Sequence, residues 1–182
     1  MHRHLFIDGW RHAVALPIVR GIKAGVVALA LLFALSISAS AAADVAALRQ
    51  KAEQGDAAAQ YGLCMAYFKG KGLAQDDRQA FEWCHKAAKQ GHARAQARVG
   101  SFLSQGKGVH ASQTEAVYWF RKAAEQGHAV AQAALGAFYK DGIGIAQDKA
   151  RAAYWYQKAA EQGFHLAQLY LGRRYYYGEG LE

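Results

Sequence analysis

Residues 126–161 read QGHAVAQAALGAFYKDGIGIAQDKARAAYWYQKAAE, and the chain on both sides repeats this pattern without a gap. The dipeptide Gln-Gly recurs in steps of 36 residues, from 54 to 90 to 126 to 162. Self-similarity at a fixed period of this size predicts an array of stacked units, each made of one supersecondary motif. The columns in register are Gln60, Gln96, Gln132 and Gln168; Gly70, Gly106, Gly142 and Gly178; Gly72, Gly108, Gly144 and Gly180; and Trp83, Trp119 and Trp155.

The first half of each unit predicts a helix, named helix A, over about residues 56–69 in the first unit. It is rich in alanine and places Leu63 and Tyr67 one helical turn apart, an apolar stripe of helical period. Gly70 follows at the position where helices commonly end in a left-handed residue. Gly-x-Gly is therefore interpreted as a turn, because no strand precedes it and no phosphate-loop lysine completes it.

The second half of each unit predicts helix B, which ends at Gln-Gly. Asp76 and Ser112 precede Gln79 and Glu115 by three residues, which is the spacing of a capping box. Asp148 occupies the same N-cap position in the third unit. No strand pattern occurs along the chain, so an all-α fold is expected.

Small residues indicate where the two helices approach each other. Gly100 and Gly136 of helix A are expected to face Ala116 and Ala152 of helix B, which would bring the two backbones close. The tryptophan column is expected to fill the core between units, since a single unit cannot bury its apolar face alone.

The repeats resemble the Sel1-like repeat, a relative of the tetratricopeptide repeat. The resemblance implies a right-handed all-α solenoid whose concave face is lined by helix A, and a non-catalytic role in binding protein or peptide partners. The first unit departs from the pattern, with Cys64 replacing a glycine and Cys84 replacing an aromatic residue. The third unit matches most fully, at Ala131, Leu135-Gly136, Tyr139, Gly142-Ile-Gly144-Ile145, Asp148, Ala152, Trp155-Tyr156, Lys158-Ala-Ala160 and Gly163.

The resemblance divides the chain into a half-repeat cap and a series of units. The cap is residues 44–53, and three repeats cover 54–89, 90–125 and 126–161. Residues 162–182 form an incomplete fourth repeat without a helix B. Two explanations are open: the gene product is truncated, or another chain covers the apolar face of this end, as in a homo-oligomer formed through it.

Residues 1–43 predict an export signal of a bacterial protein. A basic start leads into twelve uncharged apolar residues from Ala24 to Leu35, followed by small residues and cleavage sites after Ala41 or Ala43. An uncleaved membrane anchor is the alternative, because residues 24–43 carry no charge. The expected location is the periplasm, with an inner-membrane-anchored or secreted form as alternatives.

The charge of the chain does not favour nucleic acid. The formal net charge is +8, of which +3 belongs to residues 1–43. The remaining +5 is spread among acidic residues, which is typical of a solvated surface. The 53% apolar and 20% charged composition also excludes a disordered polyelectrolyte.

Cys64 and Cys84 form a candidate disulfide, because bridges persist in an exported protein. Cys64 is expected level with Ala80 and Cys84 one turn further, so the distance is borderline for a bridge. Two buried free thiols are the alternative.

No catalytic or metal site is predicted, and no cofactor. His92 and His128 share a column, but equivalent positions in stacked helices lie too far apart to bind one zinc ion. Ser104-Gln-Gly-Lys107 matches S-x-x-K by letter without its partner motifs. The alternative function is a cell-wall or β-lactam-directed hydrolase of the cysteine-rich Sel1-like type.

By analogy with the tetratricopeptide repeat, the variable columns of helix A line the binding groove. Aromatic side chains and arginine are the usual anchors of interfaces. The candidate partner-binding residues are Tyr61, Met65, Arg94, Arg173 and Tyr176.

Overall fold

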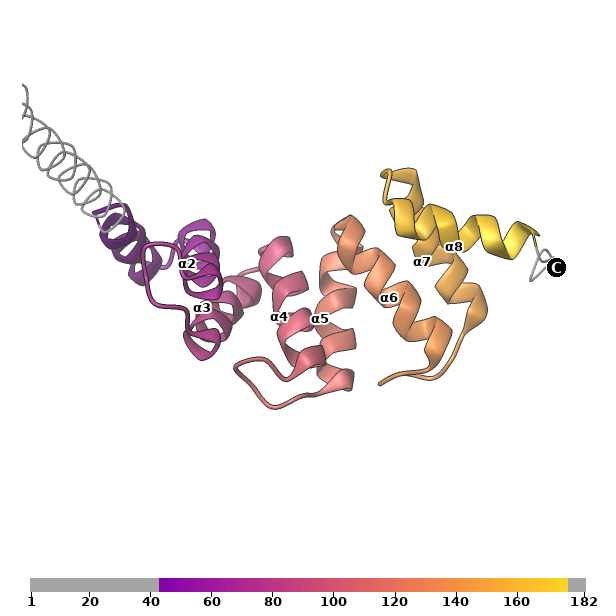
Figure 1. The fold of residues 1–182 in the computed structure, drawn as a ribbon, viewed down its shortest axis with the longest axis horizontal. Coiled ribbons are helices and arrows are strands. Elements are labelled where there is room, and N and C mark those ends of the chain that lie inside the picture. Colours follow the sequence, from indigo (N-terminus) through magenta and orange to yellow (C-terminus); the bar gives the residue numbers. More distant parts are fainter. Residues whose placement is uncertain (1–42, 177–182) are drawn as a thin grey trace, which may run out of the picture. The chain divides into compact units, whose positions relative to one another are not determined.

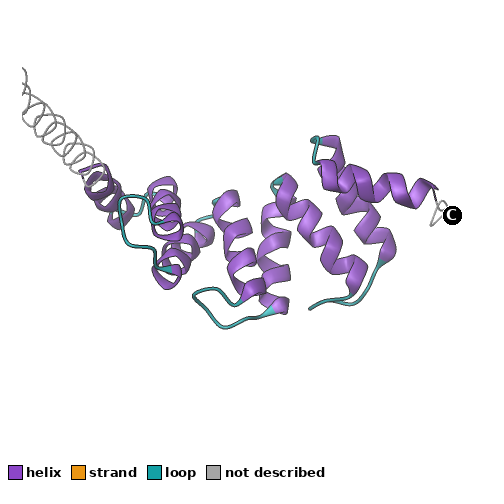
Figure 2. Ribbon diagram, viewed as in Figure 1, coloured by secondary structure: helices purple, strands orange, loops and turns teal. Residues whose placement is uncertain are grey.

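The computed structural model describes residues 43–176 and divides the chain into two units, Met1–Ala43 and Asp44–Glu182. The predicted export signal lies outside the described residues, apart from Ala43. All regular secondary structure in residues 43–176 is helical, without a strand (Figure 2). Residues 43–53 are helical and are followed by α2 (Ala57–Lys69), α3 (Asp77–Lys89), α4 (Ala93–Gln105), α5 (Gln113–Glu125), α6 (Ala129–Asp141), α7 (Lys149–Glu161) and α8 (His165–Tyr176).

Helices α2 to α8 form an α-solenoid in which each helix packs against its neighbours in the chain (Figure 1). Helices α2, α4, α6 and α8 are the predicted A helices, and α3, α5 and α7 are the B helices. The predicted all-α solenoid is therefore confirmed. Within residues 43–176, no helix combines the length and the hydropathy needed to cross a membrane.

The residues before α2 cover the front of the solenoid. Ala52 is buried and Leu48 is half-buried, and both belong to a small apolar cluster with Ala59 and Leu63 of α2. Residues 44–53 thus supply the apolar contacts that a preceding helix B would make.

The predicted caps of the B helices are present, but the capping boxes are not closed. The carboxylate of Asp76 and the hydroxyl of Ser112 accept hydrogen bonds from the amides of Gln79 and Glu115. The amide of Ser112 donates to the carbonyl oxygen of Leu103 at 3.0 Å, so it does not need the side chain of Glu115. This bond fastens the start of helix B to helix A instead.

The sequence predicted that the glycines of helix A face alanines of helix B, but their nearest neighbours are aromatic rings. A Cβ atom built on Gly100 would lie 3.0 Å from the ring of Phe120, and one on Gly136 would lie 3.1 Å from the ring of Tyr156. The aromatic ring of helix B therefore lies flat against the glycine, and the close approach is between ring and backbone. The three tryptophans are half-buried against the core rather than enclosed by it.

A ladder of glutamines connects the repeats. Gln96 is only 4% exposed, and its side chain donates to the carbonyl oxygen of Ala88 at the end of the preceding helix B. The side chain of Gln96 also accepts a hydrogen bond of 2.7 Å from the side chain of Gln126, which is the C-cap of α5, the helix B of the same repeat. Both bonds recur at equivalent positions, which explains the two glutamine columns.

We expect Gln96→Ala to lower the free energy of unfolding by about 2 kcal/mol, because it removes both hydrogen bonds of a buried side chain, one to Ala88 and one from Gln126. The matched control is Gln105→Ala in the same helix, since Gln105 is exposed and its side chain bonds only to Ser101. Urea unfolding followed by circular dichroism measures both. Equal losses for the two variants would show that the ladder adds nothing to stability.

The second glycine of the Gly-x-Gly turn carries a contact between repeats at Gly108 and Gly144. Gly144 has φ +67°, and a Cβ atom there would lie 2.6 Å from the backbone carbonyl carbon of Gln113, at the start of α5. Gly108 meets Asp77 at the start of α3 in the same way. The turn of one repeat therefore rests on the first turn of helix B in the repeat before it.

Candidate protein-interaction surface

The A helices leave one side uncovered, which we name the helix-A face. Its residues recur at the spacing that puts side chains on one side of a helix, and each of them is exposed or half-buried. They are Ala58 and Met65 of α2; Arg94, Arg98 and Ser101 of α4; Val130 and Ala137 of α6; and Leu166 and Arg173 of α8. The positions equivalent to Arg98 in α2 and α8 are covered, because Gly62 faces Leu48 and the ring centroid of Tyr170 lies 4.0 Å from that of Tyr156.

Helix α4 makes the face basic. Arg94 is exposed, and the guanidinium of Arg98 lies 4.7 Å from the ring centroid of Phe68. In the turn that follows α4, the ammonium group of Lys107 lies 4.8 Å from the same ring and is paired with Asp77 at 3.7 Å. Among the ion pairs of residues 43–176, none involves Arg94 or Arg98. Both guanidinium groups therefore keep their capacity to bind a carboxylate.

Helices α6 and α8 make the face apolar. Val130 is 51% exposed and Leu166 56%, and the two occupy equivalent positions of their helices. Leu169 of α8 is 61% exposed but does not belong to this face, since the equivalent alanines of α4 and α6 are buried. Exposed large apolar side chains that lie together on a surface indicate a contact site for another molecule.

The five candidate partner-binding residues all lie on A helices, but they are not equally available. Arg94 and Arg173 are exposed, and Tyr176 is 84% exposed near the end of α8. Met65 is half-buried. The ring of Tyr61 stacks on that of His92, with 4.8 Å between centroids, so Tyr61 takes part in packing between α2 and α4. Sequence reasoning missed Arg98, although its spacing of four residues from Arg94 was a usable signal.

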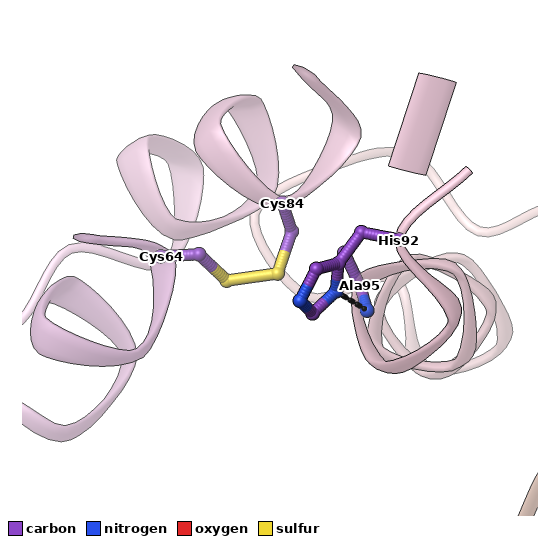
Figure 3. Close-up of a disulfide and its surroundings, with 4 residues drawn as sticks. All are labelled: Cys64, Cys84, His92 and Ala95. Carbon is purple, nitrogen blue, oxygen red and sulfur yellow. Dashed lines mark hydrogen bonds between the residues drawn. A yellow bond between two sulfur atoms is a disulfide. The ribbon is translucent and has the colours of Figure 1, made fainter. Parts of the chain in front are cut away.

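A disulfide joins Cys64 of α2 to Cys84 of α3 (Figure 3). The Cα atoms are 5.2 Å apart, inside the range for a bridge. The borderline estimate was wrong because it placed Cys64 level with Ala80. Helix A faces helix B one turn further along, so Cys64 lies opposite Cys84. In the next repeat the equivalent residues, Gly100 and Phe120, lie opposite each other in the same way. The bridge replaces a glycine–ring contact.

Two histidines cap A helices. The Nδ1 atoms of His92 and His128 accept hydrogen bonds from the amides of Ala95 and Ala131, at 3.2 and 3.3 Å (Figure 3 shows the first). Burial, and then the charge of Arg94, lowers the pKa of both imidazoles below 6.5. In residues 43–176, histidine, cysteine and acidic side chains form no cluster able to hold a metal ion.

We expect stability to fall as the pH drops below neutrality. A protonated Nδ1 cannot accept the amide hydrogen bond, so the folded state binds fewer protons than the unfolded chain, whose histidine pKa is near 6.5. The stabilisation is therefore present above about pH 7 and is lost as the pH falls through the lowered pKa values. Urea midpoints at about pH 7.5 and pH 5.5 measure the loss.

The control for this pH dependence replaces both caps by aspartate, which caps α2 in the same way at Asp56. The double variant His92→Asp and His128→Asp should lose less stability over this pH interval than the wild type. Some dependence remains, because burial also lowers the pKa of His85. If the stability of the double variant depends on pH as strongly as that of the wild type, the histidine caps are not the source of the pH dependence.

The repeat pattern identifies the family. The sequence profile of the Sel1 repeat matches residues 57–92, 93–128, 129–164 and 165–182. The chain belongs to the Sel1 repeat family. No curated protein matches the chain in sequence. Proteins built from Sel1 repeats typically mediate protein–protein interactions, and their fold is generally a non-catalytic scaffold.

Solved structures of Sel1 repeat proteins resemble this one. A Sel1 repeat protein from Oxalobacter formigenes is 41% identical over 71% of this chain and 98% of its own, with a TM-score of 0.67. A protective antigen of uropathogenic Escherichia coli is 40% identical, with a TM-score of 0.71 over 74% of this chain and 29% of its own. The cysteine-rich protein B of Helicobacter pylori shares the fold at 18% identity, with a TM-score of 0.56 over 68% of this chain and 92% of its own.

Proposed function

We propose that this Sel1 repeat protein is a non-catalytic scaffold of the bacterial cell envelope that holds a protein or peptide partner on its helix-A face. The observation that carries the proposal is the composition of this face. It presents Arg94, which is exposed and makes no ion pair in the described residues, beside exposed Val130 and Leu166. Arg98 lies one turn further along α4, with its guanidinium over the ring of Phe68.

The helices that present this face are fixed at both ends. The first turn of α4 is capped by His92, and its last turn closes on Gly106, whose φ is +67°. The N- and C-caps of α6 are His128 and Gly142. A surface built on such helices is ordered before binding, so this protein loses less conformational entropy when a partner associates.

The envelope location rests on the sequence of residues 1–43 alone. A mature protein that begins after Ala41 or Ala43 and is found in the periplasmic fraction would support it. A cytoplasmic protein with an intact N-terminus would overturn this part of the proposal.

The test of the binding surface is capture of partners from the envelope with wild type and Arg94→Glu. We expect the variant to retain less partner at an unchanged melting temperature, because Arg94 is exposed and makes no ion pair in the described residues. Lys122→Glu is the matched control, since it is an equal charge reversal at an exposed site on α5. Full retention by Arg94→Glu, or an equal loss in the control, would contradict the helix-A face as the binding site.

A further inference from the structure

Charge is distributed unequally between the two sets of helices. Asp141 is the only acidic residue in α2, α4, α6 and α8, and its carboxylate is paired with neighbouring Lys140 at 3.2 Å. The B helices α3, α5 and α7 together hold five acidic residues. Any molecule that lies along the A helices therefore meets basic groups almost without competing carboxylates.

The basic groups are concentrated on one part of the face. Arg94 and Arg98 lie one turn apart on α4, and the charges of both act on the imidazole of His128 at the start of α6. Lys107, in the turn after α4, also approaches Phe68, but its ammonium group is paired with the carboxylate of Asp77 at 3.7 Å. The next A helix, α6, offers Val130, and α8 offers Leu166 in the same column. A basic strip thus lies beside an apolar one.

We infer that the occupant of this face is a partner segment that carries carboxylate side chains next to apolar ones, with the carboxylates on Arg94 and Arg98 and the apolar side chains on Val130 and Leu166. This inference rests on the proposed function and specifies the chemistry of its partner. Paired guanidinium groups are the side chains best suited to bind carboxylates, and the exposed apolar strip supplies the buried area that charge alone does not.

The solenoid also sets the spacing of the anchors. Packed helices lie about 10 Å apart, and an extended chain advances about 3.3 Å per residue. The step from α4 to α6 therefore corresponds to about three residues of an extended partner, and the step to α8 to about six. A segment with acidic residues about three to six positions from large apolar ones fits this arrangement.

The experiment is selection of a random-peptide display library on the wild-type protein, followed by binding of the selected peptides by fluorescence anisotropy. We expect selected peptides that combine acidic and apolar residues at this spacing. The double variant Arg94→Glu and Arg98→Glu should bind them at least about tenfold more weakly. Lys122→Glu should bind them as the wild type does, and raising the salt concentration should weaken only the wild type and this control.

The outcomes separate this inference from the function it rests on. Selected peptides that lack acidic residues, or that bind the double variant as well as the wild type, overturn the inference about partner chemistry. If Val130→Asp nevertheless abolishes the binding of these peptides, the helix-A face remains the binding site. Peptides lost in Tyr118→Asp on α5 but not in Val130→Asp overturn both. A library that yields no binder to the wild type also overturns both.

Discussion

Gly108→Ala should lower the free energy of unfolding by about 3 kcal/mol. Gly108 has φ +70°, a conformation that costs a residue with a Cβ atom about 1–2 kcal/mol. The added methyl group would also fall on the backbone carbonyl of Asp77, which cannot move without disturbing the first turn of α3. The turn must therefore lift away and open the contact between the first two repeats. Urea unfolding measures the change.

Gly127→Ala is the control that separates backbone strain from contact. Gly127 also has positive φ, at +84°, but no atom lies within 4 Å of the Cβ position. It should lose only the conformational part, about 1 kcal/mol. If the two variants lose the same stability, the turn of one repeat does not support the repeat before it.

Removing the disulfide is the second change with a large expected effect. The cysteines are 20 residues apart, and a loop of this size restricts the unfolded chain by about 3 kcal/mol. Both sulfur atoms are also buried, so the double variant Cys64→Ala and Cys84→Ala should leave α2 and α3 loosely packed. Urea unfolding of this variant, and of the wild type with and without reductant, measures the effect.

The other repeats suggest a partial rescue. Cys64→Gly with Cys84→Phe reproduces the contact between Gly100 and Phe120, so it should recover about 1–2 kcal/mol over the alanine pair. Cys64→Ala with Cys84→Phe is the matched control, because a methyl group would press on the ring. If this control is as stable as the glycine–phenylalanine pair, the two repeats do not share the same packing at this position.

The repeat pattern made the fold predictable, because glycine, N-cap and aromatic columns each dictate a local structure. Which columns meet in space was harder to predict. Cys64 and Cys84 depart from the family pattern together, and this joint departure was the signal that the two positions are in contact. A second pair of positions behaves in the same way. Arg49 donates a hydrogen bond of 2.7 Å to the hydroxyl of Tyr67, and 36 residues further along His85 replaces the arginine and Leu103 replaces the tyrosine.

The helix-A face was only partly predictable. The repeat showed which residues occupy equivalent positions of the A helices, but how far their side chains are exposed depends on the packing of the helix that follows each one. Tyr61 was a candidate for partner binding, yet the sequence alone does not show that its ring is stacked against the ring of His92. The contact of Arg98 with Phe68 likewise depends on the packing of α4 against α2.

The most direct measurement of the central claim is site-specific photo-crosslinking from two positions of equal exposure. Val130 on the helix-A face is 51% exposed and Tyr118 on α5 is 52% exposed, so a photoreactive residue at either one is equally accessible. In envelope preparations, the proposed function predicts a discrete crosslinked partner from position 130 and none from position 118. Crosslinking from position 118 alone would contradict it.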